Sequence, residues 1–191
     1  MENHWSFENL QCMALSKVLT SSIFAGTAKS VHNVSLRRKE LLASVAIDSP
    51  ALCMSVGEQM LYVGHESGSI SVIDPRTNSI VNSMESHSGG VISLWVEDQL
   101  LVTSGLTYKL EMHVPDNTLR VYDVRNMKMV MPWPIPLGAS TVKICNRVIY
   151  ALCPLSYQIV SVNMGSDSLV RERIPVIYPI FAVFIRLAIS E

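Results

Sequence analysis

Two stretches of this chain follow the same pattern of apolar and polar residues, 49 positions apart. SISVIDPRTNSIV runs from Ser69 to Val81, and TLRVYDVRNMKMV runs from Thr118 to Val130. Each begins with a hydroxyl residue, alternates apolar and polar positions up to an aspartate, crosses a short polar stretch and becomes apolar again. Self-similarity at such a period indicates an array of stacked or radially arranged units, so it constrains the fold more than any other feature.

Two weaker copies extend the same register in both directions. SVHNVSLRRKELL has Ser35 at the aspartate position and YQIVSVNMGSDSLV has Asn163, which gives intervals of 39, 49 and 40 residues. The strand before each copy ends at a small residue, and these intervals are 38, 41 and 48 residues. Each series contains one long interval, and residues 106–117 lie within both long intervals. A single insertion at 106–117 therefore explains both series. We predict an extended loop there, with a turn at Pro115-Asp116-Asn117. The small residues are Gly26, Gly64, Gly105 and Cys153.

A further strand lies upstream in each unit: LQCMALS, ALCMSVG, VISLWVE and TVKICN. Four short strands at a period near 40 predict a four-stranded antiparallel blade repeated around an axis. We therefore expect an all-β, incomplete β-propeller in which Ile70, Val72, Leu119 and Val121 pack between layers. The expected blades are 8–47, 50–86, 89–136 and 139–175, followed at 176–191 by the first strand of a truncated blade, IFAVFIR.

The polar residues at the blade ends are predicted to have structural roles. Asp74 and Asp123 close the third strand of their units, and each is followed two positions later by Arg76 or Arg125. Such an aspartate can accept hydrogen bonds from the backbone of the following turn. His87 lies in the link ESHSGGV, where we expect it to bond back to the turn of its own blade. No thiol or second histidine shares its motif, so we expect no catalytic, cofactor-binding or metal residues.

Composition excludes several classes of function. The 191 residues are 49% hydrophobic and 16% charged, and the net charge of −1 provides no field for nucleic acid or an anionic membrane. The basic run Arg37-Arg38-Lys39 is expected to be a solvated turn. The four cysteines form no C-x-x-C pair and have no histidine at zinc-ligand spacing, so we expect buried core residues and a reducing, intracellular compartment. They are Cys12, Cys53, Cys145 and Cys153.

Three segments resemble features that the chain is not expected to have. MALSKVLTSSIFAGTA, at 13–28, imitates a signal peptide, but Ser and Thr interrupt it and glutamates precede it. PVIYPIFAVFIRLAIS, at 175–190, is broken by Pro179 and Arg186 and its uncharged run is too short for a spanning helix, so we predict a core strand. GHESG, at 64–68, has the wrong serine spacing for a nucleophile elbow and is predicted to be a hairpin turn.

Several motifs match the pattern of WD repeats. Ile73-Asp74 and Tyr122-Asp123 stand at the Trp-Asp position, and Ser86-His87 stands at the Gly-His position, whereas Ser35 and Asn163 depart from the pattern. From Ala51 to Leu137 the chain resembles more closely the N-terminal propeller of the catalytic subunits of the poly(A)-nuclease (PAN) deadenylation complex. That resemblance rests on DPRT, the link SGG, the glycine at 105 with its longer loop, and VYDVRNM leading into a proline-containing strand.

The resemblance implies a seven-bladed propeller that acts as a scaffold in poly(A)-tail shortening. In that family the two-cation, magnesium-dependent exonuclease lies in other domains, so no cofactor and no enzyme activity are expected of this chain. The expected partner is the complex's regulatory pseudokinase-like subunit, bound weakly. The insertion at 106–117 is expected either to contact that partner or only to shield a blade edge. No nucleic-acid or membrane binding is expected, and a cytoplasmic location, including P-bodies, is implied. A generic WD-repeat scaffold of another intracellular complex is the alternative.

Overall fold

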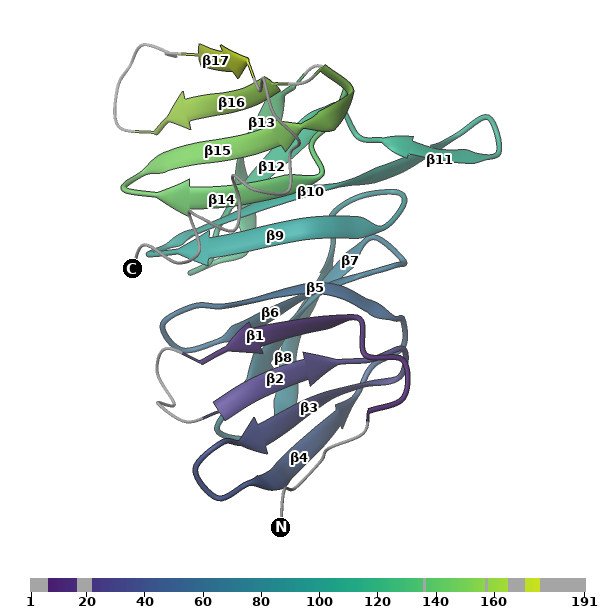
Figure 1. Cartoon of the computed structure of the whole chain (residues 1–191), viewed down its shortest axis with the longest axis vertical. Coiled ribbons are helices and arrows are strands. Elements are labelled where there is room, and N and C mark those ends of the chain that lie inside the picture. The colour runs from purple at the N-terminus through teal and green to yellow at the C-terminus, as the bar shows by residue number, and fades with distance from the viewer. Residues whose placement is uncertain (1–6, 17–21, 136, 157, 165–170, 176–191) are drawn as a thin grey trace.

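The computed structural model describes residues 7–16, 22–135, 137–156, 158–164 and 171–175. Within these residues, four antiparallel sheets follow one another along the chain (Figure 1). The helical structure described is a single 3-10 turn at Pro154–Ser156, and no described helix is long and apolar enough to cross a membrane. The all-β fold is confirmed. The expected strand IFAVFIR lies outside the described residues.

Each sheet is built from strands that are consecutive in the sequence. The first contains β1 (Cys12–Leu15), β2 (Ser22–Gly26), β3 (Ser30–Ser35) and β4 (Glu40–Ala46). The second contains β5 (Ala51–Val56), β6 (Leu61–His65), β7 (Ser69–Asp74) and β8 (Ser79–Glu85). The third contains β9 (Val91–Glu97), β10 (Leu100–Lys109), β12 (Thr118–Asp123) and β13 (Lys128–Pro134), with β11 (Met112–Pro115) paired to the end of β10. The fourth contains β14 (Thr141–Cys145), β15 (Val148–Cys153), β16 (Gln158–Asn163) and β17 (Arg171–Pro175).

The first strands of the sheets, β1, β5, β9 and β14, lie beside one another, as propeller geometry requires (Figure 1). Side chains join these inner strands across the sheet boundaries. The Cys12 thiol donates to the carbonyl of Ala51 over 3.3 Å, and the Cys53 thiol donates to the carbonyl of Val91 over 3.3 Å. The same kind of contact therefore recurs at two successive boundaries, one repeat apart.

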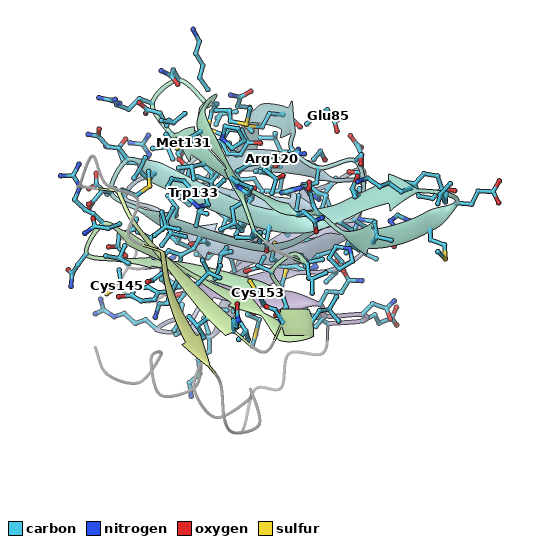
Figure 2. The ribbon with its side chains drawn as sticks, turned by 90° about the horizontal axis from the view of Figure 1, so that it is seen from above. Glu85, Arg120, Met131, Trp133, Cys145 and Cys153 are labelled. Carbon is cyan, nitrogen blue, oxygen red and sulfur yellow. The ribbon has the colours of Figure 1, made fainter. Side chains whose placement is uncertain are left out.

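Three apolar clusters lie between the sheets and hold the arrangement together. Ile70 and Val72 belong to the cluster between the second and third sheets, and Leu119 and Val121 belong to the one between the third and fourth. All four residues are buried, so their predicted packing between layers is confirmed. Figure 2 shows Met131 and Trp133 on the outer strand β13. Trp133 is buried in the cluster between the third and fourth sheets, whereas Met131 is exposed.

The pairing of the third and fourth strands repeats even its irregularities. A shift of register occurs at Asn33/Val34 in the first sheet, at Val72/Ile73 in the second and at Val121/Tyr122 in the third. These bulges stand one or two positions before Ser35, Asp74 and Asp123. A bulge increases local twist, so its recurrence gives three successive blades the same curvature before their turns.

The segment 106–117 corrects the expectation of an extended loop. Strand β10 continues to Lys109, a two-residue turn at Leu110-Glu111 reverses the chain, and β11 returns to Pro115. The insertion is therefore a two-stranded hairpin, hereafter the ribbon (Leu106–Pro115), that extends beyond the adjoining strands (Figure 1). The turn predicted at Pro115-Asp116-Asn117 is shorter in the structure: Pro115 ends β11, and Asp116-Asn117 connect it to β12.

The cysteines are all free, but one of them is not in the core. Cys153 is buried and Cys12 and Cys53 are partly buried, whereas Cys145 is exposed, contrary to expectation. It ends β14 beside a two-residue turn, where its side chain leaves the packed layer. Figure 2 labels Cys145 and Cys153, which lie at opposite ends of the fourth sheet.

Candidate functional site

The turn after β7 is built on the Asp74 carboxylate. Its Oδ1 accepts the backbone N–H of Arg76 over 2.9 Å, and its Oδ2 accepts Nη2 of the same arginine over 3.1 Å. The backbone N–H of Asn78 donates to the Asp74 carbonyl over 2.8 Å. The side-chain hydrogen bond from Arg76, followed by the backbone bond, holds the pKa of Asp74 below its ordinary value.

The turn after β12 repeats that arrangement 49 residues later. Oδ1 of Asp123 accepts both the backbone N–H and Nε of Arg125 over 2.9 Å, and Oδ2 accepts Nη2. The backbone N–H of Met127 donates to the Asp123 carbonyl over 2.8 Å. The hydrogen bonds from Arg125 lower the pKa of Asp123 to about 2. Both carboxylates are ionised and engaged by their own turns, so they organise backbone and are unsuited to proton transfer at neutral pH.

His87 is the centre of a buried polar network in the third sheet. One ring nitrogen, Nδ1, lies 2.8 Å from Oδ2 of Asp116, and the other, Nε2, lies 3.0 Å from Oγ1 of Thr103. Burial lowers the pKa of His87, although the hydrogen bond to Asp116 opposes it. The ring is therefore neutral: Nδ1–H donates to the carboxylate, which can only accept, and Nε2 accepts the threonine hydroxyl proton.

The link that carries His87 is tied to two sheets at once. The backbone N–H groups of Ser86 and His87 both donate to the carbonyl of Gly68, in the β6–β7 turn of the second sheet. The Ser86 hydroxyl lies 3.0 Å from the Tyr122 hydroxyl, in the third sheet. We expected His87 to bond to the turn of its own blade: its backbone bonds to the β6–β7 turn of the sheet before the link, and its ring bonds to Thr103 and Asp116 of the sheet that follows.

Sequence reasoning did not single out Thr103, Asp116 or Tyr122 for this network. Two signals were present, since Tyr122 stands at the Trp-Asp position and Asp116 lies in the turn sequence PDN. The glycine at 105 makes room for the ring: a Cβ there would lie 2.5 Å from Cγ of His87. In the second sheet the corresponding end of β6 carries His65, which is buried and bonds to Ser71 Oγ over 2.8 Å.

A pocket of mixed apolar and polar lining lies along the inner strands. Its volume is about 960 Å³, and its lining includes Met13, Met54 and Trp95. The ammonium group of Lys143 lies 4.9 Å from the Trp95 ring centroid, in a cation–π contact. Among the described residues, no group of three or more His, Cys, Asp or Glu side chains could hold a metal ion.

The ribbon carries the most exposed apolar side chains beside this network. Leu110 is 92% exposed, Met112 is 61% exposed and Tyr108 is 54% exposed. The Tyr108 ring packs edge-on against His113, with centroids 5.3 Å apart. The sites that sequence reasoning selected therefore form turns and links, and the ribbon is one of several places where apolar side chains are exposed. This arrangement suits contact with another protein.

Comparison with known proteins agrees with this geometry. The family model described as PAN2 N-terminal matches residues 6–157. The catalytic subunit PAN2 of the PAN2-PAN3 deadenylation complex of Candida albicans is 26% identical over 145 residues, which cover 72% of this chain and 12% of that protein. The Kluyveromyces lactis subunit is 32% identical over 106 residues, 56% of this chain and 9% of that protein. The chain thus spans about a tenth of the length of these relatives.

Solved structures show the same fold. The Neurospora crassa Pan2 WD40 domain superposes with a TM-score of 0.73 and 17% identity, covering 85% of this chain and 52% of that one. U3-55K gives a TM-score of 0.74 at 14% identity, covering 88% of this chain and 53% of that one. At these identities the two structures establish a propeller fold and nothing about function. The described sheets correspond to about half of each propeller chain.

Proposed function

The chain belongs to the PAN2 N-terminal family, and from this membership we propose that it is a scaffold of a PAN2-type deadenylase, acting through protein contacts in the shortening of mRNA poly(A) tails. The match to the family model over 6–157 carries the proposal. The sites support it: the carboxylates of Asp74 and Asp123 are each held by an arginine of the same turn, and His87 is neutral and buried. These groups build the fold and leave the surface to recognition.

The partner in this proposal is the PAN3-type regulatory subunit, after the complex that the relatives' names record. Binding is weak, because interface area limits affinity and a chain that spans about a tenth of its relatives supplies part of a larger interface. The nuclease chemistry, with its magnesium ions, belongs to other parts of a PAN2-type protein. The chain itself uses no cofactor, binds neither RNA nor membrane, and works in the cytoplasm, including P-bodies.

Affinity purification from cells of the source organism tests this function. The tagged full chain is the bait, and a WD-repeat propeller of similar size from an unrelated complex is the matched control. We expect the PAN3-type subunit to be enriched with the chain and absent with the control. Enrichment of a different complex with no PAN3-type subunit would refute the proposal in favour of the generic WD-repeat scaffold.

An activity assay tests the proposal that the nuclease chemistry belongs to other parts of a PAN2-type protein. We expect the purified chain to leave a labelled poly(A) substrate unshortened, with or without magnesium, because a two-cation site requires several converging carboxylates. Metal-dependent shortening that persists after a second purification step would contradict the scaffold role.

A further inference from the structure

We propose that the pocket along the inner strands, hereafter the inner-strand pocket, binds an extended segment of a partner protein in which a lysine or arginine lies between apolar residues. This inference goes beyond the proposed function, which assigns no surface to a particular kind of ligand. The pocket has a volume of about 960 Å³, at the upper end of the range of about 300–1,000 Å³ for ligand sites. It is therefore large enough for several side chains of an occupant.

The shape of the inner-strand pocket favours an extended occupant. Its lining comes from all four inner strands, from Leu15 on β1 to Lys143 on β14, which lie side by side (Figure 1). Successive sheets pack about 10 Å apart, so a row of four inner strands spans about 30 Å. An extended chain covers about 3.3 Å per residue, so about nine residues reach from β1 to β14. A compact small molecule would contact only part of this lining.

Three carboxylates lie at one end of the pocket. The inner strands β5 and β9 run in the same direction, as side-chain hydrogen bonds near both of their ends show. Glu58 lies in the turn after β5, Glu97 is the last residue of β9 and Asp98 follows it. All three residues line the pocket. Because the two strands are parallel, these acidic residues share one end of the pocket.

The carboxylates leave this end with unbalanced negative charge. Among the described residues that line the pocket, Lys143 is the one basic residue, and its ammonium group lies 4.9 Å from the Trp95 ring centroid. The side chains of Glu58 and Asp98 have no hydrogen bond or ion pair within the part of the chain that the structure describes. A cation on the occupant therefore fits this end, whereas an acidic segment or a nucleic acid is repelled.

Apolar side chains line the pocket at β1. Cys12 and Ala14 pack against the cluster between the first and second sheets, so Met13 and Leu15 project from the opposite face of the strand. Met13 is 62% exposed and Leu15 is 67% exposed. The stem of a lysine or arginine covers apolar surface of this kind while its charged head stays at a carboxylate. The occupant therefore combines apolar residues with a basic one.

Hydrogen bonds between the inner strands keep the pocket preformed. Ser55 Oγ accepts the backbone N–H of Val96 over 3.2 Å, and Ser93 Oγ accepts the backbone N–H of Val142 over 3.1 Å. Both serines belong to the lining of the pocket. Because these bonds fix neighbouring strands relative to one another, binding has little further ordering of the site to bring about.

Synthetic peptides and the full chain test the inference by fluorescence anisotropy. The probe is a labelled peptide of about nine residues with blocked ends, in which leucine and lysine alternate. We expect saturable binding with a dissociation constant on the order of 10–100 µM, weakened about tenfold when the salt concentration rises from about 50 to about 500 mM. Matched peptides with glutamate in place of lysine, or serine in place of leucine, should each bind at least about tenfold more weakly.

The decisive variant is Glu58→Gln with Asp98→Asn, because it removes two charges and keeps the shape of both side chains. Asparagine also suits the left-handed backbone of Asp98, whose φ is 52°. We expect this variant to bind the leucine–lysine peptide about fivefold more weakly, with an unchanged melting temperature. The matched control is Glu85→Gln with Glu111→Gln, which removes two exposed carboxylates outside the pocket and should leave peptide binding unchanged. Glu85 is labelled in Figure 2.

The outcomes separate this inference from the proposed function. Failure to bind the leucine–lysine peptide at up to about 1 mM would overturn the inference, and so would equal binding of the glutamate peptide. Equal losses in the two double variants would also overturn it, because they would reflect net charge alone. Binding that appears only after removal of residues 176–191 would make a segment of this chain the occupant, in place of a partner. Peptide binding without any association with the PAN3-type subunit would keep the pocket and refute the scaffold role.

Discussion

Replacing His87 with alanine tests the join between the second and third sheets. The imidazole is buried, and its nitrogens lie 2.8 Å from the Asp116 carboxylate and 3.0 Å from the Thr103 hydroxyl. Loss of a hydrogen bond to a charged group costs about 1.5–3 kcal/mol, and loss of one to a neutral group costs about 1 kcal/mol. Both partners keep one other contact, to Arg120 and Ser86 respectively, which limits the penalty.

We therefore expect His87→Ala to lower the free energy of unfolding by about 3 kcal/mol. For a chain of this length, that corresponds to a fall in melting temperature of about 6 to 12 °C. The assay is thermal and urea unfolding followed by circular dichroism near 218 nm. His113→Ala is the matched control, because His113 is an exposed histidine on the neighbouring ribbon. A change of less than about 0.5 kcal/mol is expected for it.

Equal stability losses in His87→Ala and His113→Ala would refute this reasoning. They would show that the buried network contributes no more than an exposed ring. A large loss in His87→Ala with an unchanged slope of unfolding free energy against urea would show that the sheets still unfold as one unit.

Three further predictions concern single positions. Gly105→Ala should destabilise the chain by about 3 kcal/mol in urea unfolding, because its Cβ would lie 2.5 Å from Cγ of His87 and 2.6 Å from the Gly90 carbonyl oxygen; a stable variant would contradict that packing. Burial lowers the pKa of His87 and keeps the ring neutral, so the free energy of unfolding should be highest above the unfolded pKa near 6.5 and decrease as the pH falls below it. This decrease should be smaller in His87→Ala, and an unchanged pH profile would count against the assignment. A thiol reagent at pH 8 should modify Cys145 first, since burial raises the pKa of Cys12 to about 11 and also raises that of Cys53; Cys145→Ser should remove the fast phase, and its persistence would place a different cysteine at the surface.

The repeat made the fold predictable, because a period-2 pattern that recurs near every 40 residues has few physical solutions. Asp74 and Asp123 were visible for the same reason: an aspartate followed by a polar turn forms local hydrogen bonds that need only neighbouring residues. The buried packing of Val72 and Val121 also followed from strict alternation. Features that depend on residues close together in the sequence could therefore be predicted from the sequence.

The remaining features depend on contacts between distant residues. His87 and Asp116 are 29 positions apart, and nothing in either motif indicates the other. The ribbon was missed because Leu110-Glu111 lacks the Asn-Gly or Asp-Gly signal of a two-residue hairpin. Cys145 was assigned to the core because its neighbours are apolar, although it stands at the last position of its strand.

Isothermal titration calorimetry of the purified full chain against the PAN3-type subunit of the same organism tests the scaffold role most directly. We expect a saturable association with a dissociation constant on the order of micromolar, because in the proposed function this chain supplies part of a larger interface. The heat capacity change should be negative, because the contact buries apolar surface. Absence of any binding heat at several temperatures would contradict the scaffold role, and nanomolar affinity would contradict the proposal that this chain supplies only part of a larger interface.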